Sequence, residues 1–378
     1  MPATRRARST PSRKPAPQDP GLLKIYSQNV CVLPVGGRET WLQPASLIGS
    51  VLLPIFLIST LHSSPLLLVS TTTILLTTAF FCPVGYLLAA PLWAGSNLFS
   101  HDYKAERLAC LADRLAVPGT LEPAYDVVLL QELFGCWYSD VHRLELVRLM
   151  KQRGYLYHAM PSCSLLSILP SFWANSGLAV FSRHPLSDAA SHTFKNQLFY
   201  DYWLVNRGVL GATVDAPREK GGKLRVFSVH FGPPVSVLTF FSFVPVAVME
   251  FFDKYRQQIS EVTSLVVAAS PLPSVVAGDM NCVPSSPHYA TLKSCLLKEA
   301  GLETCCPGFE RKTAKATANP RGERALTGGK RTPKVLDYVF ANGGLAGRCR
   351  CGVGGMKVRG REFEMISDHA PVEATIKF

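Results

Sequence analysis

Short polar segments stand where apolar, strand-like runs of this chain begin or end. A lone Asn or His in such a place is usually a turn or structural residue, but so many endings in one chain are hard to attribute to turns. Strands place several rigid side chains at one pole of a sheet, where they can act together. In chain order the segments are Asn29, Gln131-Glu132, His230, Asp279-x-Asn281 and Asp368-His369.

The residue types in these segments suit one chemistry. Carboxylate and amide oxygens, such as those of Glu132, Asp279 and Asn29, are the ligands that Mg²⁺ prefers. Histidines such as His230 and His369 can carry protons near neutral pH. No zinc cluster and no glycine-rich phosphate loop accompanies them. The pattern therefore favours metal-assisted chemistry with general acid–base catalysis.

The elements that must position these residues alternate along the chain. Helical spacing of apolar residues predicts helices over Tyr103–Leu115, Asp140–Gln152 and Phe251–Val267. Many strands and a few helices from distant parts of the chain predict two packed sheets with helices outside, an α+β fold built as a four-layer α/β/β/α sandwich. The predicted strands are Leu22–Ser27, Asp126–Leu130, Leu178–Phe181, Val209–Val214, Leu224–Val229, Ser274–Ala277, Val335–Phe340 and Val372–Ile376.

One long apolar segment interrupts this rhythm. No Asp, Glu, Lys or Arg lies between Glu39 and Asp102, and the run breaks at His62–Pro65. Each half approaches the roughly 20 residues that cross a bilayer core, and Trp41 and Trp93 bracket the run as interfacial aromatics do. Residues 44–98 are therefore predicted to form a transmembrane or re-entrant helical hairpin; the alternative is a very apolar buried insertion.

The net charge of +12 is compatible with a nucleic acid or anionic lipid partner, or simply with a basic protein surface. It is concentrated in residues 1–20 and 309–334, which are poor in large apolar residues, so we expect a disordered basic tail and a flexible basic loop. A hairpin returns the chain to its starting side, so the basic tail and the catalytic domain share one membrane face. Because positive charge favours the inner face, we expect a membrane protein whose catalytic domain faces the cytosol.

The chain has eleven cysteines but no Cys-x-x-Cys pair, and it has no Asn-x-Ser/Thr glycosylation acceptor. These features favour reduced thiols.

Taken in order, the motifs resemble those of the endonuclease/exonuclease/phosphatase superfamily, which has the deoxyribonuclease I-like fold. Within it, the chain is similar to the neutral sphingomyelinases. The resemblance extends from Leu22 to the end of the chain apart from the apolar insertions. The motifs that carry it are Asn29–Pro34, Gln131–Phe134, Ser176–Pro185, Asn206–Leu210, His230, Gly278–Asn281, Leu336–Val339 and Ser367–Val372.

The resemblance implies a role for each polar residue. Glu132 is expected to be the principal Mg²⁺ ligand, with Asn29 beside it and Asp368 near the metal shell; Mn²⁺ is an expected substitute. His369 is expected to be the general base, held in the right tautomer by Asp337. Three further residues complete the expected site: Asp279 and Asn281 position the attacking water and the phosphate, and His230 stabilises the pentacoordinate phosphorus or helps the leaving oxygen.

The implied domain spans residues 21–378, and the implied reaction is phospholipase C-type hydrolysis of sphingomyelin to ceramide and phosphocholine. On this fold, residues 232–252 and Ser164–Trp173 are expected to form an apolar interfacial rim beside the site, unless they pack on the base of the hairpin. The basic tail and loop are expected to attract anionic lipids.

The resemblance leaves the substrate open. Inositol-phosphoceramide, a lysophospholipid or another phosphorylated lipid is the first alternative. A membrane-attached nuclease is less favoured, because a nuclease has little use for apolar segments beside its site, and a non-catalytic scaffold is least favoured. A phosphocholine pocket needs aromatic faces, for which the candidates are Tyr200, Tyr202 and Trp203.

Overall fold

The structure is a computed structural model of the chain. It describes residues 21–32, 103–135, 140–163, 174–197, 205–217, 222–232, 246–310, 317–318, 334–342, 344–355, 358 and 366–378. The predicted tail at residues 1–20 and the predicted hairpin at 44–98 lie outside these ranges. Within them, no helix is both long enough and apolar enough to cross a membrane.

The described strands form two sheets, each of mixed direction. The first sheet has the order β11-β12-β1-β2-β4-β3, and the second has the order β5-β6-β7-β8-β10-β9. The first comprises β11 (Cys349–Val353), β12 (Val372–Lys377), β1 (Leu22–Val32), β2 (Val127–Leu133), β4 (Ala179–Ser182) and β3 (Tyr157–Ala159). The second comprises β5 (Leu186–Thr193), β6 (Gly208–Asp215), β7 (Lys223–His230), β8 (Ser274–Asp279), β10 (Asp337–Ala341) and β9 (Glu303–Thr304).

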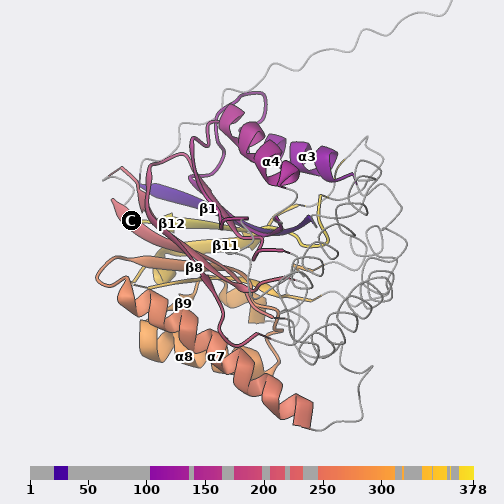
Figure 1. Cartoon of the computed structure of the whole chain (residues 1–378). Helices are drawn as coiled ribbons and strands as arrows, with labels where there is room; N and C mark the ends of the chain where they lie inside the picture. The colour runs from indigo at the N-terminus through magenta and orange to yellow at the C-terminus, as the bar shows by residue number, and fades with distance from the viewer. Residues whose placement is uncertain are drawn as a thin grey trace, which may run out of the picture.

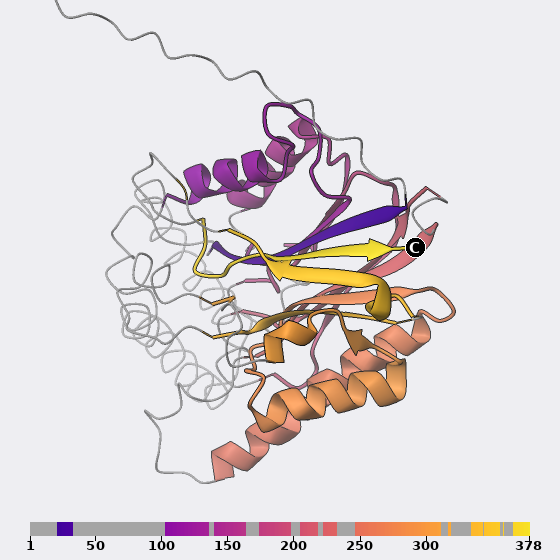
Figure 2. The same cartoon turned by 180° about the vertical axis from the view of Figure 1, so that it is seen from behind.

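Helices cover the outer face of each sheet, so the molecule has four layers (Figures 1 and 2). Helices α3 (Lys104–Arg114) and α4 (Val141–Gln152) lie on the first sheet, and α7 (Val246–Ala268) and α8 (Pro287–Ala300) lie on the second. The larger apolar core fills the space between the sheets and continues under α7 and α8. A smaller core lies under α3 and α4. The predicted α/β/β/α arrangement is confirmed for the described residues.

Helix α8 was absent from the predicted elements, although local signals mark both of its ends. The Ser286 side chain caps the helix by accepting a hydrogen bond from the Tyr289 N–H at 3.2 Å, and Pro287 occupies the first turn. Gly301 ends it in the left-handed conformation, with φ of 60°. Its apolar side chains Leu292 and Leu296 are buried in the larger core.

Helix α7 begins at Val246 and not at Phe251 as predicted. Its first turns therefore lie inside the segment 232–252 that was predicted as an apolar interfacial insertion, because the apolar residues there continue the helical pattern. Residues 233–245 of that segment lie outside the described residues.

The predicted flexible loop at 309–334 contains a fixed point at Thr317, which is fully buried. Its hydroxyl accepts hydrogen bonds from the backbone N–H groups of Leu336 at 2.9 Å and Asp337 at 3.1 Å. Its carbonyl accepts one from Ala370 at 2.6 Å. Thr317 thus satisfies buried backbone groups of two other segments; residues 311–316 and 319–333 of the predicted loop lie outside the described residues.

The expectation of reduced thiols is wrong for one pair, because Cys306 and Cys351 form a disulfide with their Cα atoms 5.2 Å apart. Cys306 follows β9 and Cys351 lies in β11, which are the outermost strands of the two sheets. The bridge therefore ties the sheets together along one edge of the sandwich. Residue spacing could not reveal it, since the two cysteines meet only when the sheets pack.

Candidate active site

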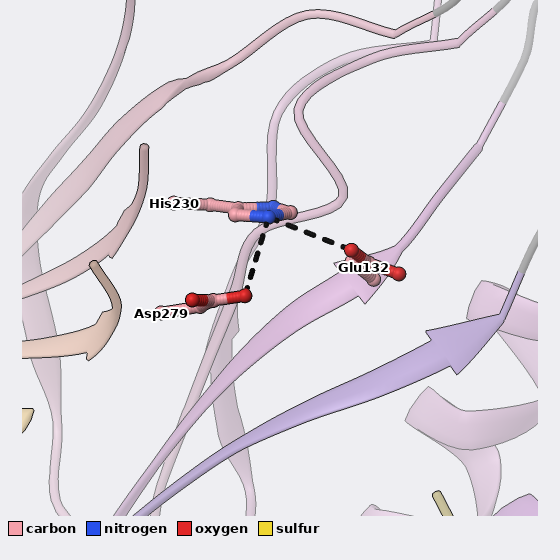
Figure 3. Close-up of side chains that lie close together, drawn as sticks. All are labelled: Glu132, His230 and Asp279. Atoms are coloured by element: carbon pink, nitrogen blue, oxygen red, sulfur yellow. Dashed lines mark ion pairs between the residues drawn. The ribbon is translucent and has the colours of Figure 1, made fainter. Parts of the chain in front are cut away.

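Parallel pairing brings site residues to one pole of the sandwich. Strands β1 and β2 run parallel, with Asn29 opposite Gln131, so Glu132 follows at the same end. Strands β7 and β8 also run parallel, with His230 opposite Asp279. The sheets face each other, and the side chains of Glu132, His230 and Asp279 point toward one another between them (Figure 3).

Antiparallel strands bring two further segments to the same pole. Strand β10 begins at Asp337, which lies opposite Asp279 at the end of β8. Strand β12 begins at Val372, opposite Ser27 of β1, so the preceding residues Asp368 and His369 lie at that end as well. The predicted site residues, from both sheets and from distant parts of the chain, thus converge.

The first cluster contains carboxylate, amide and imidazole groups. The Asn29 side-chain amide donates a hydrogen bond to Asp279 Oδ2 at 3.2 Å. His230 Nε2 lies 3.5 Å from Glu132 Oε1 and 3.6 Å from the same Asp279 oxygen. Asn29, His230 and Asp279 are buried, with His230 and Asp279 at most 2% exposed, and Glu132 is half-buried. The cluster is therefore a desolvated, mainly oxygen-lined centre.

The second cluster is a buried histidine–carboxylate pair. His369 Nδ1 lies 2.9 Å from Asp337 Oδ2, and His369 Nε2 lies 4.0 Å from Asp279 Oδ2. The Asp337 contact orients the ring and leaves Nε2 directed at the first cluster. Asp279 belongs to both clusters and so connects them.

The backbone at two site residues adopts a conformation that non-glycine residues rarely use. Glu132 has φ of 57° and Asn281 has φ of 50°. The Asn281 backbone N–H donates to Asp279 Oδ1 at 2.8 Å, and its side-chain amide donates to the Phe231 carbonyl at 2.8 Å. Gly278 has φ of 148°, and a Cβ there would strike the Val229 carbonyl. The strained backbone at Glu132 and Asn281 thus helps to orient the Glu132 and Asp279 carboxylates.

Burial controls the electrostatics of the carboxylates. It raises the pKa of Glu132, while the nearby Arg207 guanidinium opposes that rise. It raises the pKa of Asp279 to about 7, an effect that His369 opposes and Asp337 reinforces. Both carboxylates lack enough compensating positive charge in the protein alone, as expected for ligands of a cation.

The two histidines differ in charge. Burial lowers the pKa of His230 well below its ordinary value, and Arg207 and His369 lower it further. Burial also acts to lower the pKa of His369, but Asp337, Asp279 and Asp368 outweigh it and raise that pKa well above its ordinary value. His230 is therefore neutral near pH 7. His369 is protonated, because the negative charges of the surrounding carboxylates stabilise its imidazolium form.

The residues present fit a divalent metal ion. Glu132, His230 and Asp279 offer ligand atoms that lie within 4.8 Å of one another, and so do Asp279, Asp337 and His369. Asp337 Oδ1 is buried without a hydrogen-bond partner among the described residues. A mainly oxygen donor set of this kind suits Mg²⁺ better than zinc.

Asp368, the third predicted metal ligand, is less closely placed. It is half-buried and belongs to neither of the two clusters. Its charge nevertheless acts on the pKa values of both Glu132 and His369, so it lies at the same pole. The predicted headgroup aromatics Tyr200, Tyr202 and Trp203 lie outside the described residues, as does the apolar stretch at 164–173.

Sequence reasoning gave no role to several residues that hold the site together. Arg207 was noted only within a family motif, yet its guanidinium reaches His230 and Glu132. The Asn175 side-chain oxygen accepts hydrogen bonds from the N–H groups of Gly135 at 3.1 Å and Gly177 at 3.0 Å, beside Glu132. The signal available for Asn175 was its place next to the Ser176–Pro185 motif.

The Endonuclease/Exonuclease/phosphatase family model matches residues 97–369. No curated protein matches the chain by sequence.

Several solved structures superpose on this chain. SmcL superposes with a TM-score of 0.59 at 16% identity, covering 94% of this chain and 99% of its own. A mutant beta toxin from Staphylococcus aureus with bound magnesium ions gives 0.56 at 15% identity, covering 93% and 98%. Sphingomyelinase C from Streptomyces griseocarneus gives 0.52 at 18% identity, covering 72% and 92%. At identities this low, these superpositions establish a shared fold and nothing further.

Proposed function

Because the chain belongs to the Endonuclease/Exonuclease/phosphatase family, we propose that it catalyses Mg²⁺-dependent, phospholipase C-type hydrolysis of sphingomyelin to ceramide and phosphocholine at a membrane surface. The observation that carries the proposal is the sharing of Asp279 between an oxygen-rich cluster and a buried His369–Asp337 pair. A base and a charge-binding centre thus lie side by side, as phosphodiester hydrolysis requires.

Each residue has a defined part in this reaction. Asp279 accepts a hydrogen bond from the attacking water, and His369 takes the proton of that water through Nε2 as its oxygen attacks phosphorus. Asp337 stabilises the resulting imidazolium through Nδ1, to which it lies 2.9 Å away. The phosphorus–oxygen bond to ceramide breaks, the ceramide oxygen takes a proton from water and leaves as an alcohol, and the His369 imidazolium returns its proton to solvent.

His369 must be neutral before it can accept a proton. Asp337, Asp279 and Asp368 raise the pKa of His369. A cation bound beside Asp279 and Asp368 would offset their negative charge and lower the His369 pKa toward the range in which a histidine base works. His230 remains neutral and donates a hydrogen bond to a phosphoryl oxygen.

Glu132 and Asn29, with Asp368 nearby, are the residues proposed to hold Mg²⁺; Mn²⁺ is a proposed substitute. When bound, the metal supplies Lewis-acid stabilisation of the charge on the phosphoryl and leaving oxygens.

Two features support a lipid substrate. Solved structures of the same fold include a sphingomyelinase C, and the apolar segments 44–98 and 232–252 follow Asn29 and His230 in the sequence. We propose that residues 44–98 attach the protein to the membrane, with the catalytic domain facing the cytosol and the basic segments meeting anionic lipid. The Cys306–Cys351 disulfide does not favour a cytosolic location, which is proposed from the positive charge of the sequence alone.

The test is the release of product from vesicles that contain sphingomyelin, inositol-phosphoceramide or lysophosphatidylcholine, with plasmid DNA assayed in parallel. We expect Mg²⁺-dependent release of phosphocholine from sphingomyelin at a higher kcat/KM than from the other substrates. A higher kcat/KM for another lipid would support phospholipase C-type hydrolysis but would contradict sphingomyelin as the preferred substrate. Cleavage of DNA with no action on any lipid would refute the proposal.

A further inference from the structure

Arg207 is a buried arginine whose position is set by its backbone. Its N–H donates to the buried Gln197 side chain at 2.8 Å, and its carbonyl accepts from the Phe194 N–H at 3.0 Å. A Cβ on the next residue, Gly208, would strike the His192 carbonyl. The backbone that carries Arg207 is therefore held close to β5, and its side chain is only 4% exposed.

The guanidinium extends into the first cluster. Arg207 Nη1 lies 2.8 Å from His230 Nδ1 and also contacts Nε2 of the same ring. It lies 3.8 Å from Glu132 Oε1, which is itself 3.5 Å from His230 Nε2. Two nitrogen atoms thus converge on one carboxylate oxygen at distances longer than a hydrogen bond.

We propose that Arg207 is a catalytic residue whose guanidinium binds, together with His230, a non-bridging oxygen of the phosphodiester. The proposal rests on the proposed function and deepens it. Attack at phosphorus increases the negative charge on the non-bridging oxygens, and a fixed cation at that point stabilises the transition state more than the ground state. Arginine suits this role because its charge is permanent and its donors are rigidly arranged.

The test compares Arg207→Met, which removes the charge, with Arg207→Lys, which keeps it. Arg225→Met, at the opposite end of β7 from His230, is the matched control. Isothermal titration calorimetry measures the binding of inorganic phosphate to Mg²⁺-loaded protein and the binding of Mg²⁺ alone, and thermal denaturation confirms folding. These titrations need no knowledge of the true diester, so they remain informative if sphingomyelin is not hydrolysed.

We expect Arg207→Met to weaken phosphate binding about tenfold or more and to lower kcat by about 10²–10³-fold, the usual cost of one transition-state donor. Binding of Mg²⁺ should change less than about threefold, and Arg207→Lys should recover at least part of both losses. Unchanged phosphate affinity in a folded Arg207→Met variant would overturn the proposal. A loss of Mg²⁺ affinity with no loss of phosphate affinity would also overturn it, because Arg207 would then only position Glu132.

An independent observation concerns the cysteines beside the disulfide. Cys305 precedes Cys306, and Cys349 lies two residues before Cys351 on β11, so Cys349 and Cys351 point to the same face of the strand. The side chains of Cys305 and Cys349 are hydrogen-bonded to each other. That contact raises the pKa of Cys305 and lowers that of Cys349. The cysteines thus form two adjacent pairs between the sheet edges.

We propose that Cys305 and Cys349 are a modification site that closes to a second disulfide when the chain meets a small-molecule disulfide such as oxidised glutathione. The Cys349 thiolate attacks the glutathione disulfide, which forms a mixed disulfide and releases one glutathione thiol. The Cys305 sulfur then attacks Cys349 Sγ, which releases the second thiol. Two electrons and two protons pass from the protein to glutathione.

The test is peptide mapping by mass spectrometry after oxidised glutathione and then alkylation. The variant Cys306→Ser/Cys351→Ser isolates the new pair, and the same variant with Cys305→Ser added is the control. We expect a bridge between the Cys305 and Cys349 peptides in the first and none in the second. Alkylation of both cysteines in the folded first variant would overturn the proposal, as would a stable glutathione adduct that never resolves.

Discussion

At the scale of single residues, one pair of atoms joins the proposed base to the proposed metal centre. His369 Nε2 faces Asp279 Oδ2 at 4.0 Å, while Asp337 holds the other ring nitrogen at 2.9 Å. A base fixed by a buried partner needs no rearrangement to act. The cost is that its protonation depends on neighbouring charges.

Replacing the base tests its role directly. We expect His369→Ala to lower kcat by about 10²–10⁴-fold, the usual contribution of general acid–base catalysis, with Mg²⁺ affinity reduced far less. His184→Ala is the matched control, because His184 is also buried and also contacts an aspartate, Asp126, at 2.9 Å, but lies outside the site. A His369→Ala enzyme with full activity would contradict the assignment.

The raised pKa of Asp279, about 7, makes metal binding depend on pH. Below that pKa the carboxyl beside the metal site is protonated and no longer attracts Mg²⁺, so affinity rises with pH and then levels. Between pH 6 and pH 8 we expect roughly a tenfold gain in Mg²⁺ affinity, measured by calorimetry, with proton release on binding. Asp279→Asn should bind more weakly and lose most of this gain. A flat profile in the wild-type protein would show that Mg²⁺ binding is not coupled to the Asp279 carboxyl.

At the scale of elements, the strand ends are the part of the site that sequence predicts best. Apolar runs that end in Asn29, His230 or Asp279 indicated which residues face the pole, because the buried strands have a strong local pattern. Strand β5 was not predicted, since its residues are largely exposed and do not alternate. The positive φ of Glu132 was equally invisible, because only tertiary contacts sustain it.

The close approach of β8 to β7 at Gly278 gives a prediction for stability. Gly278→Ala adds a methyl group against the Val229 carbonyl at φ of 148°. We expect a loss of about 3 kcal/mol from overpacking and backbone strain, measured by urea unfolding. Gly347→Ala, where no atom lies within 4 Å of the added Cβ, should change stability by less than about 0.5 kcal/mol. Equal effects of the two substitutions would contradict this account of the Gly278 backbone.

The disulfide between the sheet edges gives a second prediction at this scale. Cys306 and Cys351 are separated by 45 residues, so their bridge should contribute about 2–4 kcal/mol to the free energy of unfolding. The double variant Cys306→Ser/Cys351→Ser should lose that amount in urea unfolding under non-reducing conditions. Cys110→Ser, at a half-buried cysteine of α3 that packs against the smaller core, should lose clearly less. No loss in the double variant would show that the bridge does not form in solution.

At the scale of the whole molecule, the two sheets each contribute part of the site. The first sheet supplies Asn29 and Glu132, and the second supplies His230, Asp279 and Asp337. Packing of the sheets is therefore what assembles the chemistry. Sequence predicted the four layers, because amphipathic helices must cover buried sheets, but it could not predict which side chains meet across the interface. The approach of Arg207 to Glu132 and the Cys306–Cys351 bridge both form only when the two sheets pack together.

The central claim is that this pole is a metal-dependent phosphodiesterase site built on Glu132. The most direct test is a Mg²⁺ titration of phosphocholine release from sphingomyelin vesicles, comparing the wild-type protein with Glu132→Gln. We predict saturable activation of the wild-type enzyme, no activity with a chelator, and a loss of at least about 10²-fold in the variant. Equal hydrolysis by both proteins, or hydrolysis that persists undiminished in the chelator, would contradict the claim.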